Sequence, residues 1–206
     1  MSQFAYVVDD DDAVRLSVRA LLSTRPGLFV SGFASGDAFL DGVEDRESGV
    51  VILDVNMPGL SGLDVLKRLV PYEHRFSAIV ITGQGDITMA VQAMKFGAVD
   101  FLEKPYRPDE LFAALDNAFD LLAEARKRAE RSEIASALIK DLSPRERSVL
   151  SLLIEGMPNK LMANQLGLSV RTVEVHRANV MTKLGVNSLP DVMRLAFHAG
   201  LVEQDI

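Results

Sequence analysis

The sequence predicts a doubly wound α/β domain followed by a small all-helical domain, on the basis of three observations. In the first 122 residues, five short apolar runs alternate strictly with five stretches of helical periodicity. From residue 140 onward, the pattern is helical throughout. The charge also divides the chain, because residues 1–122 carry 19 acidic and 10 basic side chains whereas residues 140–206 carry 7 and 8. Two domains with different partners are therefore expected.

The five apolar runs have the length of strands, and strict alternation with helices indicates a parallel sheet covered by helices on both faces. For five strands this predicts the flavodoxin-like order 2-1-3-4-5. Two runs are apolar without alternation, as expected for strands that are buried on both sides. The strands are expected at residues 4–8, 29–33, 50–53, 78–81 and 99–102, and the helices at residues 14–23, 37–43, 63–69, 87–96 and from 108 onward.

The helix that begins near Pro108 has no obvious stop, because no Gly or Pro occurs between Asp109 and Ser143. Pairs such as Glu124 with Arg128 would support a solvated helix. We therefore predict a first domain over residues 1–122, a helical linker over 123–139 and a second domain over 140–206. The alternative is that the helix ends near residue 122 and the rest of the linker is flexible.

The second domain starts with a helix-start signature, in which Ser143 is the cap, Pro144 is the first helical residue and Glu146 follows three residues after the cap. Residues 159–166 and 170–184 form a pair of helices joined by a short turn, which is a helix-turn-helix pattern. Three glycines divide this region into four short helices: Gly156, Gly167 and Gly185.

Composition excludes several classes of protein. The 206 residues include no cysteine, which excludes a disulfide scaffold, thiolate zinc sites and a thiol nucleophile. No apolar run approaches the ~20 residues that a membrane-spanning helix needs, and the N-terminus has no basic leader or small-residue cleavage site. We expect a soluble cytoplasmic protein without a membrane partner.

Aspartates follow two of the predicted strands directly. Asp9 and Asp10 follow the first strand, and Asp54 follows the third. These strands are neighbours in the predicted order, so the carboxylates of Asp9 or Asp10 and of Asp54 should converge at the carboxyl edge of the sheet. Crowded carboxylates need a proton or a hard cation, and oxygen ligands with room for water are typical of a magnesium site. The simpler interpretation is that the aspartates only cap the following helix.

Thr82 and Lys104 follow the fourth and fifth strands at the same edge. A hydroxyl and an ammonium beside a carboxylate and a bound cation are what an aspartyl phosphate would need around it. The grouping of these residue types therefore indicates phosphoryl chemistry at Asp54.

With these motifs in place, residues 3–122 resemble the receiver domain of two-component response regulators. The matching pieces are VVDD at residues 7–10, LDVNMPGLSG at 53–62, ITG at 81–83 and FLEKP at 101–105. Residues 141–203 resemble the LuxR-type helix-turn-helix domain, through LSPRER at 142–147, GMPNK at 156–160 and the segment at 168–184. The whole chain resembles the NarL/FixJ family of response regulators.

The resemblance implies that Asp54 accepts phosphate from a sensor histidine kinase. It also implies a Mg²⁺ ion that Asp10 and Asp54 bind directly, together with the backbone carbonyl of Asn56. Asp9 would act mostly through water.

Three further residues receive roles from the resemblance. Lys104 would contact the phosphoryl group, Thr82 would move to bond it, and the rotamer of Phe101 would follow Thr82. The Lys104–Pro105 peptide bond would be cis. One departure is Gln84, where FixJ relatives usually carry His, and this leaves phosphorylation intact.

The predicted recognition helix, residues 170–184, has a polar face near its N-terminal half, which normally meets base edges. On this face Arg171 can read guanine, Glu174 can accept from cytosine and Val175 can touch a thymine methyl group. Because the domain has few cations, we expect a dimer that reads two half-sites. The residues assigned to DNA phosphates are Lys160, Thr172, Arg177 and Lys183.

The sequence therefore predicts a transcription regulator that is activated by phosphorylation, not an enzyme beyond self-phosphorylation and autodephosphorylation. Its expected partners are a sensor histidine kinase, promoter DNA, RNA polymerase and, on phosphorylation, a second copy. One alternative is a Mg²⁺-dependent phosphohydrolase with Asp54 as nucleophile, although Asn56 stands where such enzymes carry a second aspartate. Another is an interaction module that is never phosphorylated.

Overall fold

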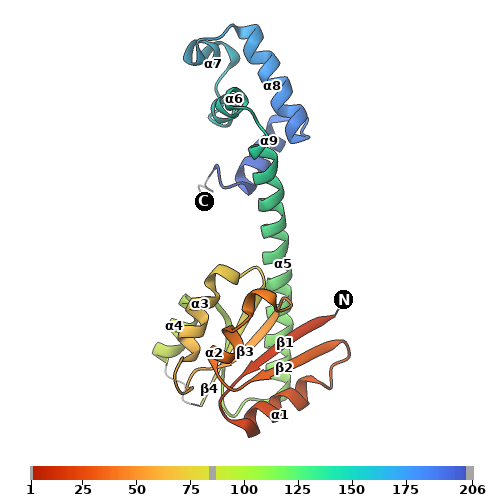
Figure 1. The fold of residues 1–206 in the computed structure, drawn as a ribbon, viewed down its shortest axis with the longest axis vertical. Coiled ribbons are helices and arrows are strands. Elements are labelled where there is room, and N and C mark those ends of the chain that lie inside the picture. Colours follow the sequence, from red (N-terminus) through yellow and green to blue (C-terminus); the bar gives the residue numbers. More distant parts are fainter. Residues whose placement is uncertain (1, 84–86, 203–206) are drawn as a thin grey trace. The chain divides into compact units, whose positions relative to one another are not determined.

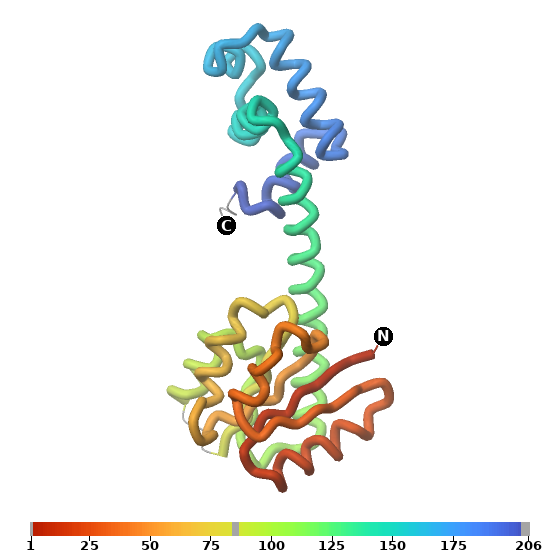
Figure 2. Tube along the Cα trace, in the orientation of Figure 1, coloured from red at the N-terminus to blue at the C-terminus, as the bar shows by residue number. Residues whose placement is uncertain are grey.

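The structure is a computed structural model that describes residues 2–83 and 87–202, so Gln84 lies outside the described residues. The chain divides into two compact units, Met1–Arg126 and Lys127–Ile206. Helix α5 (Pro108–Lys140) is continuous, so it does not end near residue 122 (Figures 1 and 2). The segment predicted as a helical linker, residues 123–139, lies within this one helix.

The first unit contains the predicted five-stranded parallel sheet, in the order β2-β1-β3-β4-β5 (Figure 1). Each predicted strand is present, with ends that extend by one or two residues. Strands β3 and β4 are buried along their whole length, as their unbroken apolar runs predict. The strands are β1 (Gln3–Val8), β2 (Leu28–Phe33), β3 (Gly49–Asp54), β4 (Phe76–Thr82) and β5 (Ala98–Glu103).

Two apolar cores cover the two faces of the sheet. One contains side chains of α1 (Asp12–Leu22) and of the first turns of α5, and the other contains side chains of α2 (Gly36–Leu40), α3 (Gly62–Leu69) and α4 (Ile87–Lys95). The helix predicted over residues 37–43 is shorter than expected and ends at Leu40. The backbone of Asp41 is extended, with a ψ of 115°, and Gly42 follows with a left-handed φ of 72° before a short 3-10 turn at Val43–Asp45.

The second unit packs four short helices around one apolar core, as predicted. The predicted helix start is a complete capping box, in which Ser143 Oγ accepts from Glu146 N and the Glu146 carboxylate accepts from Ser143 N. Across residues 2–83 and 87–202, no helix combines the length and the apolar character that crossing a membrane would take. The four helices are α6 (Pro144–Ile154), α7 (Asn159–Leu166), α8 (Val170–Leu184) and α9 (Leu189–His198).

Candidate functional site

The carboxyl edge of the sheet collects the predicted site residues. Asp54 is the last residue of β3, and Thr82, which is fully buried, is the last residue of β4. The backbone N–H of Lys104 donates to the carbonyl of Thr82 at 2.8 Å, which continues the β4–β5 pairing by one residue. Asp9 follows β1, the strand that pairs with β3. Parallel pairing therefore brings four segments that are distant in sequence to one edge.

Lys104 lies between two buried carboxylates. Its Nζ donates to Asp54 Oδ1 at 2.7 Å and to Asp9 Oδ2 at 2.9 Å, and the two aspartates are only 7% and 4% exposed. Burial alone would lower the pKa of Lys104, but the hydrogen bonds to Asp54 and Asp9 outweigh it and raise the pKa above its usual value. One ammonium for two carboxylates leaves a net negative charge at this edge.

Backbone groups orient both carboxylates. The second oxygen of Asp54 accepts from the backbone N–H of Asn56 at 2.7 Å, and the second oxygen of Asp9 accepts from the backbone N–H of Asp11 at 2.9 Å. In each case the donor is two residues downstream, which is the Asx-turn pattern. The sequence analysis did not anticipate these contacts, although an aspartate at the end of a strand is a signal for such a turn.

Asp10 does not join this cluster. Its side chain is exposed, and within the described ranges no three Asp, Glu or His residues lie close enough to hold a metal ion. The carboxylates that converge are those of Asp9 and Asp54, since both accept from Lys104 Nζ. Asp11 accepts from two backbone N–H groups at the start of α1, so the aspartate that caps this helix is Asp11.

Close packing fixes the neighbourhood of Asp54. A Cβ atom at Gly62, the first residue of α3, would lie 2.3 Å from the backbone carbonyl oxygen of Asp54, so only glycine allows this approach. Phe101 on β5 is half-buried and packs against the core on the α3–α4 face. The Lys104–Pro105 peptide bond is cis, as expected from the resemblance.

The chemistry of the donor set fits Mg²⁺. The side chains of Asp9 and Asp54 and the backbone carbonyl of Asn56 offer oxygen atoms only, which hard divalent cations prefer. The two carboxylates carry one more charge than Lys104 neutralises. A cation would therefore be stabilised at this edge of the sheet by both charge and ligand type.

The helical unit presents five of the seven predicted DNA-contacting residues in exposed positions, and one of these five, Lys183, also has a partner within the unit. Arg171, Glu174 and Val175 are exposed in the N-terminal half of α8, and Lys160 is exposed at the start of α7. The structure thus places the predicted base-reading side chains on one solvent-facing part of the predicted recognition helix.

Three of these seven residues have partners inside the unit. The hydroxyl of Thr172 lies 2.7 Å from Ser169 Oγ, the N-cap of α8. The guanidinium of Arg177 donates to the side-chain oxygen of Asn159. Lys183 Nζ donates to Glu146 Oε2 at 2.7 Å. Lys183 therefore has a carboxylate partner where the sequence analysis expected a DNA phosphate.

Glu146 is the residue that the sequence analysis used only as a cap. It is 4% exposed, and its carboxylate accepts from both Lys183 Nζ and the backbone N–H of Ser143. These two hydrogen bonds, that of Lys183 first, lower the pKa of Glu146 to about 2. A lysine one residue before the end of α8 gave no sequence signal for a partner on α6, because the contact depends on tertiary packing.

Each of the two units matches a known protein family. The model of the response regulator receiver domain matches residues 5–116, and that of the LuxR family of bacterial regulatory proteins matches residues 140–196. The transcriptional regulatory protein FixJ of Bradyrhizobium diazoefficiens is 45% identical over 197 residues, which cover 96% of each chain.

Two solved structures extend the similarity to three dimensions. The response regulator StyR has a TM-score of 0.76 and 38% identity, over 96% of this chain and 99% of its own. Full-length FixJ from B. japonicum has a TM-score of 0.59 and 44% identity, over 98% and 100%. The matches span both units, in the same order along the chain. This chain therefore belongs to the FixJ-like response regulators, transcription regulators that join a receiver domain to a LuxR-type DNA-binding domain.

Proposed function

We propose that Asp54 is the residue that accepts the phosphoryl group from a sensor histidine kinase. The contact of Lys104 Nζ with both Asp54 and Asp9 carries this proposal. It places a protonated amine beside a buried, negatively charged oxygen at the carboxyl edge of the sheet. In the transfer, an Asp54 oxygen attacks phosphorus, the bond from phosphorus to the kinase imidazole nitrogen breaks, and an acyl phosphate forms.

The residues around Asp54 divide the work. Asp10, Asp54 and the Asn56 carbonyl would hold Mg²⁺ directly, and Asp9 would do so mostly through water. When bound, the ion would neutralise part of the charge of the incoming phosphoryl group. The Asn56 backbone N–H keeps the carboxylate in one orientation. Lys104 exchanges its hydrogen bond to the Asp54 carboxylate for one to a phosphoryl oxygen. The new hydrogen bond is favourable because both the ammonium and the phosphoryl oxygen are charged.

Two residues link the phosphoryl group to the rest of the receiver domain. Thr82 donates its hydroxyl to a phosphoryl oxygen, and Phe101, half-buried on the adjacent strand, changes rotamer with it. Such a local change biases a two-state surface. We propose that the biased surface joins two copies, so that two DNA-binding units reach one promoter in the cytoplasm and act on RNA polymerase.

On DNA, the exposed residues Arg171, Glu174 and Val175 read base edges. Lys160 contacts phosphate, and Thr172 and Arg177 do so from positions already fixed by their partners in the unit. We assign Lys183 to positioning α8, because its ammonium is bound to the buried Glu146. The phosphohydrolase alternative has no support in the comparisons, since the family is a regulator and not a typical enzyme.

The test is phosphorylation of the full chain by acetyl phosphate with Mg²⁺, followed by intact-mass spectrometry. We expect one phosphoryl group on the native chain and none on Asp54→Asn. Asp11→Asn is the matched control, because it makes the same chemical change and Asn still caps α1. An equal phosphoryl increment on Asp54→Asn would show that another residue is the acceptor.

A further inference from the structure

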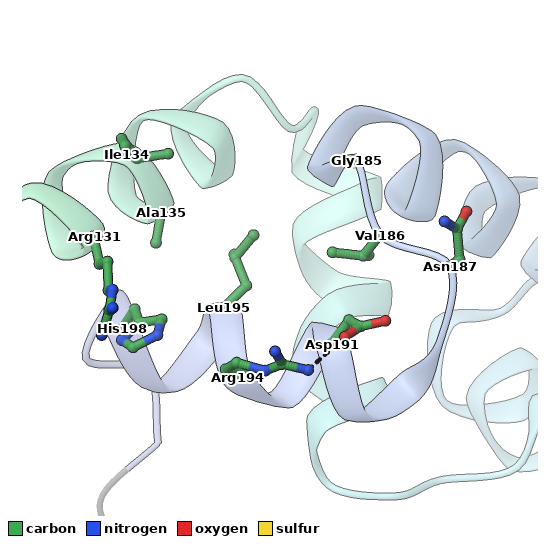
Figure 3. Close-up of a pocket in the computed structure, with 10 residues that line it drawn as sticks. All are labelled: Arg131, Ile134, Ala135, Gly185, Val186, Asn187, Asp191, Arg194, Leu195 and His198. Carbon is green, nitrogen blue, oxygen red and sulfur yellow. Dashed lines mark hydrogen bonds and ion pairs between the residues drawn. The ribbon is translucent and has the colours of Figure 1, made fainter.

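The helical unit contains a pocket that none of the functions above uses. It has a volume of about 440 Å³ and lies between the C-terminal part of α5 and α9, next to the turn that follows α8 (Figure 3). This volume is typical of sites for small organic molecules. All its lining residues belong to the Lys127–Ile206 unit, and none is a predicted DNA contact.

One part of the pocket is apolar. Ile134 on α5, Val186 in the turn after α8 and Leu195 on α9 contribute aliphatic side chains to the wall. Val186 and Leu195 also pack against the core of the unit, whereas Ile134 is 62% exposed. An apolar ligand would bury the exposed surface of Ile134, and burial of apolar surface contributes favourable binding free energy.

The other end of the pocket carries a guanidinium and an imidazole. Arg131 from α5 and His198 from α9 lie at the same end, as Figure 3 shows. The one acidic residue among the lining residues, Asp191, is bound to Arg194 at 2.6 Å. Over residues 2–83 and 87–202, no acidic side chain forms an ion pair with Arg131. As far as the described residues are concerned, the guanidinium of Arg131 is therefore available to an anion.

We propose that this pocket binds a small organic carboxylate with an apolar body. The carboxylate pairs with the guanidinium of Arg131, whose planar fork matches two oxygen atoms, and His198 supplies a further donor. The apolar body lies against Ile134 and Leu195. Such a ligand contacts α5, α9 and the turn after the recognition helix at once, so it stabilises the arrangement of these three segments by mass action.

The experiment uses the full chain and three probes: benzoate, neutral benzamide and inorganic phosphate. Binding is followed by amide chemical shifts in ¹⁵N-labelled protein and by calorimetry. We expect saturable shifts at Gly185, Val186 and Leu195 with benzoate. Benzamide lacks the charge and phosphate lacks the apolar body. The affinity for each should therefore be lower than the affinity for benzoate by about tenfold or more.

Two variants test the anion contact. Arg131→Gln should weaken benzoate binding about tenfold or more, because it removes the charge-assisted pair. Arg128→Gln is the matched control, since Arg128 is exposed one turn earlier on α5 and does not line the pocket, and it should bind benzoate as the native chain does.

Each of the following results would overturn the proposal: no saturable response to benzoate, equal binding of benzoate by Arg131→Gln, phosphate or benzamide as effective as benzoate, and shifts confined to residues outside the pocket. Sedimentation of the same samples covers one more occupant. If a second copy of the chain buried the pocket and excluded benzoate, the site would be an interface and not a ligand site.

Discussion

Each unit contains a lysine bound to a buried carboxylate, but the balance of charge differs between the two. In the receiver unit, Lys104 lies between Asp9 and Asp54, so one positive charge meets two negative charges. In the helical unit, Lys183 meets Glu146 alone. Glu146 also accepts from the backbone of its own helix cap.

The difference indicates what each contact can do. A balanced pair whose acceptor is also a helix cap holds α6 and α8 together and has no charge left for a ligand. An unbalanced group is stabilised further when a cation arrives, and its lysine can exchange one anionic partner for another. Charge balance, more than the presence of an ion pair, separates a reactive site from a structural contact.

The largest predicted effect concerns the cation. Asp10→Ala should abolish Mg²⁺ binding, because Asp10 is the one proposed carboxylate ligand that does not already accept from Lys104. Asp11→Ala should keep Mg²⁺ binding and lose about 1 kcal/mol of stability, because it removes the N-cap of α1. Calorimetric titration with Mg²⁺ and denaturant unfolding separate the two. Equal loss of Mg²⁺ binding in both variants would show that the proposed ligand assignment is wrong by one residue.

Lys104→Met sharpens the comparison within the receiver unit. Without Mg²⁺, the variant should lose about 3 kcal/mol of stability, because two buried carboxylates then face each other unpaired. Mg²⁺ should restore more stability to this variant than to the native chain, since the cation replaces the missing ammonium. Urea unfolding with and without Mg²⁺ measures this. If Mg²⁺ affected both chains equally, the ion and Lys104 would not share the same carboxylates.

In the helical unit, smaller effects should distinguish residues that contact DNA from Lys183, which positions α8. Arg171→Ala should cost about 2 kcal/mol on the correct operator and relax the choice of one base. Lys183→Met should lower the melting temperature and leave the salt dependence of DNA binding unchanged, whereas Lys160→Ala should reduce the salt slope by about one. Binding isotherms at several salt concentrations decide this. A reduced slope for Lys183→Met would show that Lys183 does contact phosphate.

The same pair predicts an effect of pH. The pKa of Glu146 is lowered from 4.5 to about 2 in the folded chain, chiefly by Lys183. Its stabilisation is therefore fully present above the unfolded pKa and is lost as the pH falls through the folded one. In acid unfolding followed by helicity, Glu146→Gln should remove this part of the pH dependence.

The sequence predicted the elements of the fold well because each has a local cause. Unbroken apolar runs gave β3 and β4, and the capping box at Ser143 gave the start of α6. The residues that meet at the carboxyl edge of the sheet could also be named, because strand ends of a parallel sheet must meet at one edge.

What the sequence could not supply depends on tertiary packing. The Lys183–Glu146 bond joins two helices, and Gly62 approaches Asp54 closely, at distances that are set only in the folded chain. The exposure of Asp10 likewise depends on how the folded chain packs around it. The early end of α2 was missed for a local reason, the extended backbone at Asp41 followed by left-handed backbone at Gly42, which apolar periodicity does not register.

We expect a cation to act on the unbalanced carboxylates and not on the balanced pair. Hydrogen exchange of the full chain, measured by peptide mass spectrometry with and without Mg²⁺, tests this most directly. Mg²⁺ should slow exchange in peptides that contain Asp9, Asp54 and Lys104 and leave those with Glu146 and Lys183 unchanged. Equal protection of both sets, or none at the end of β3, would contradict it.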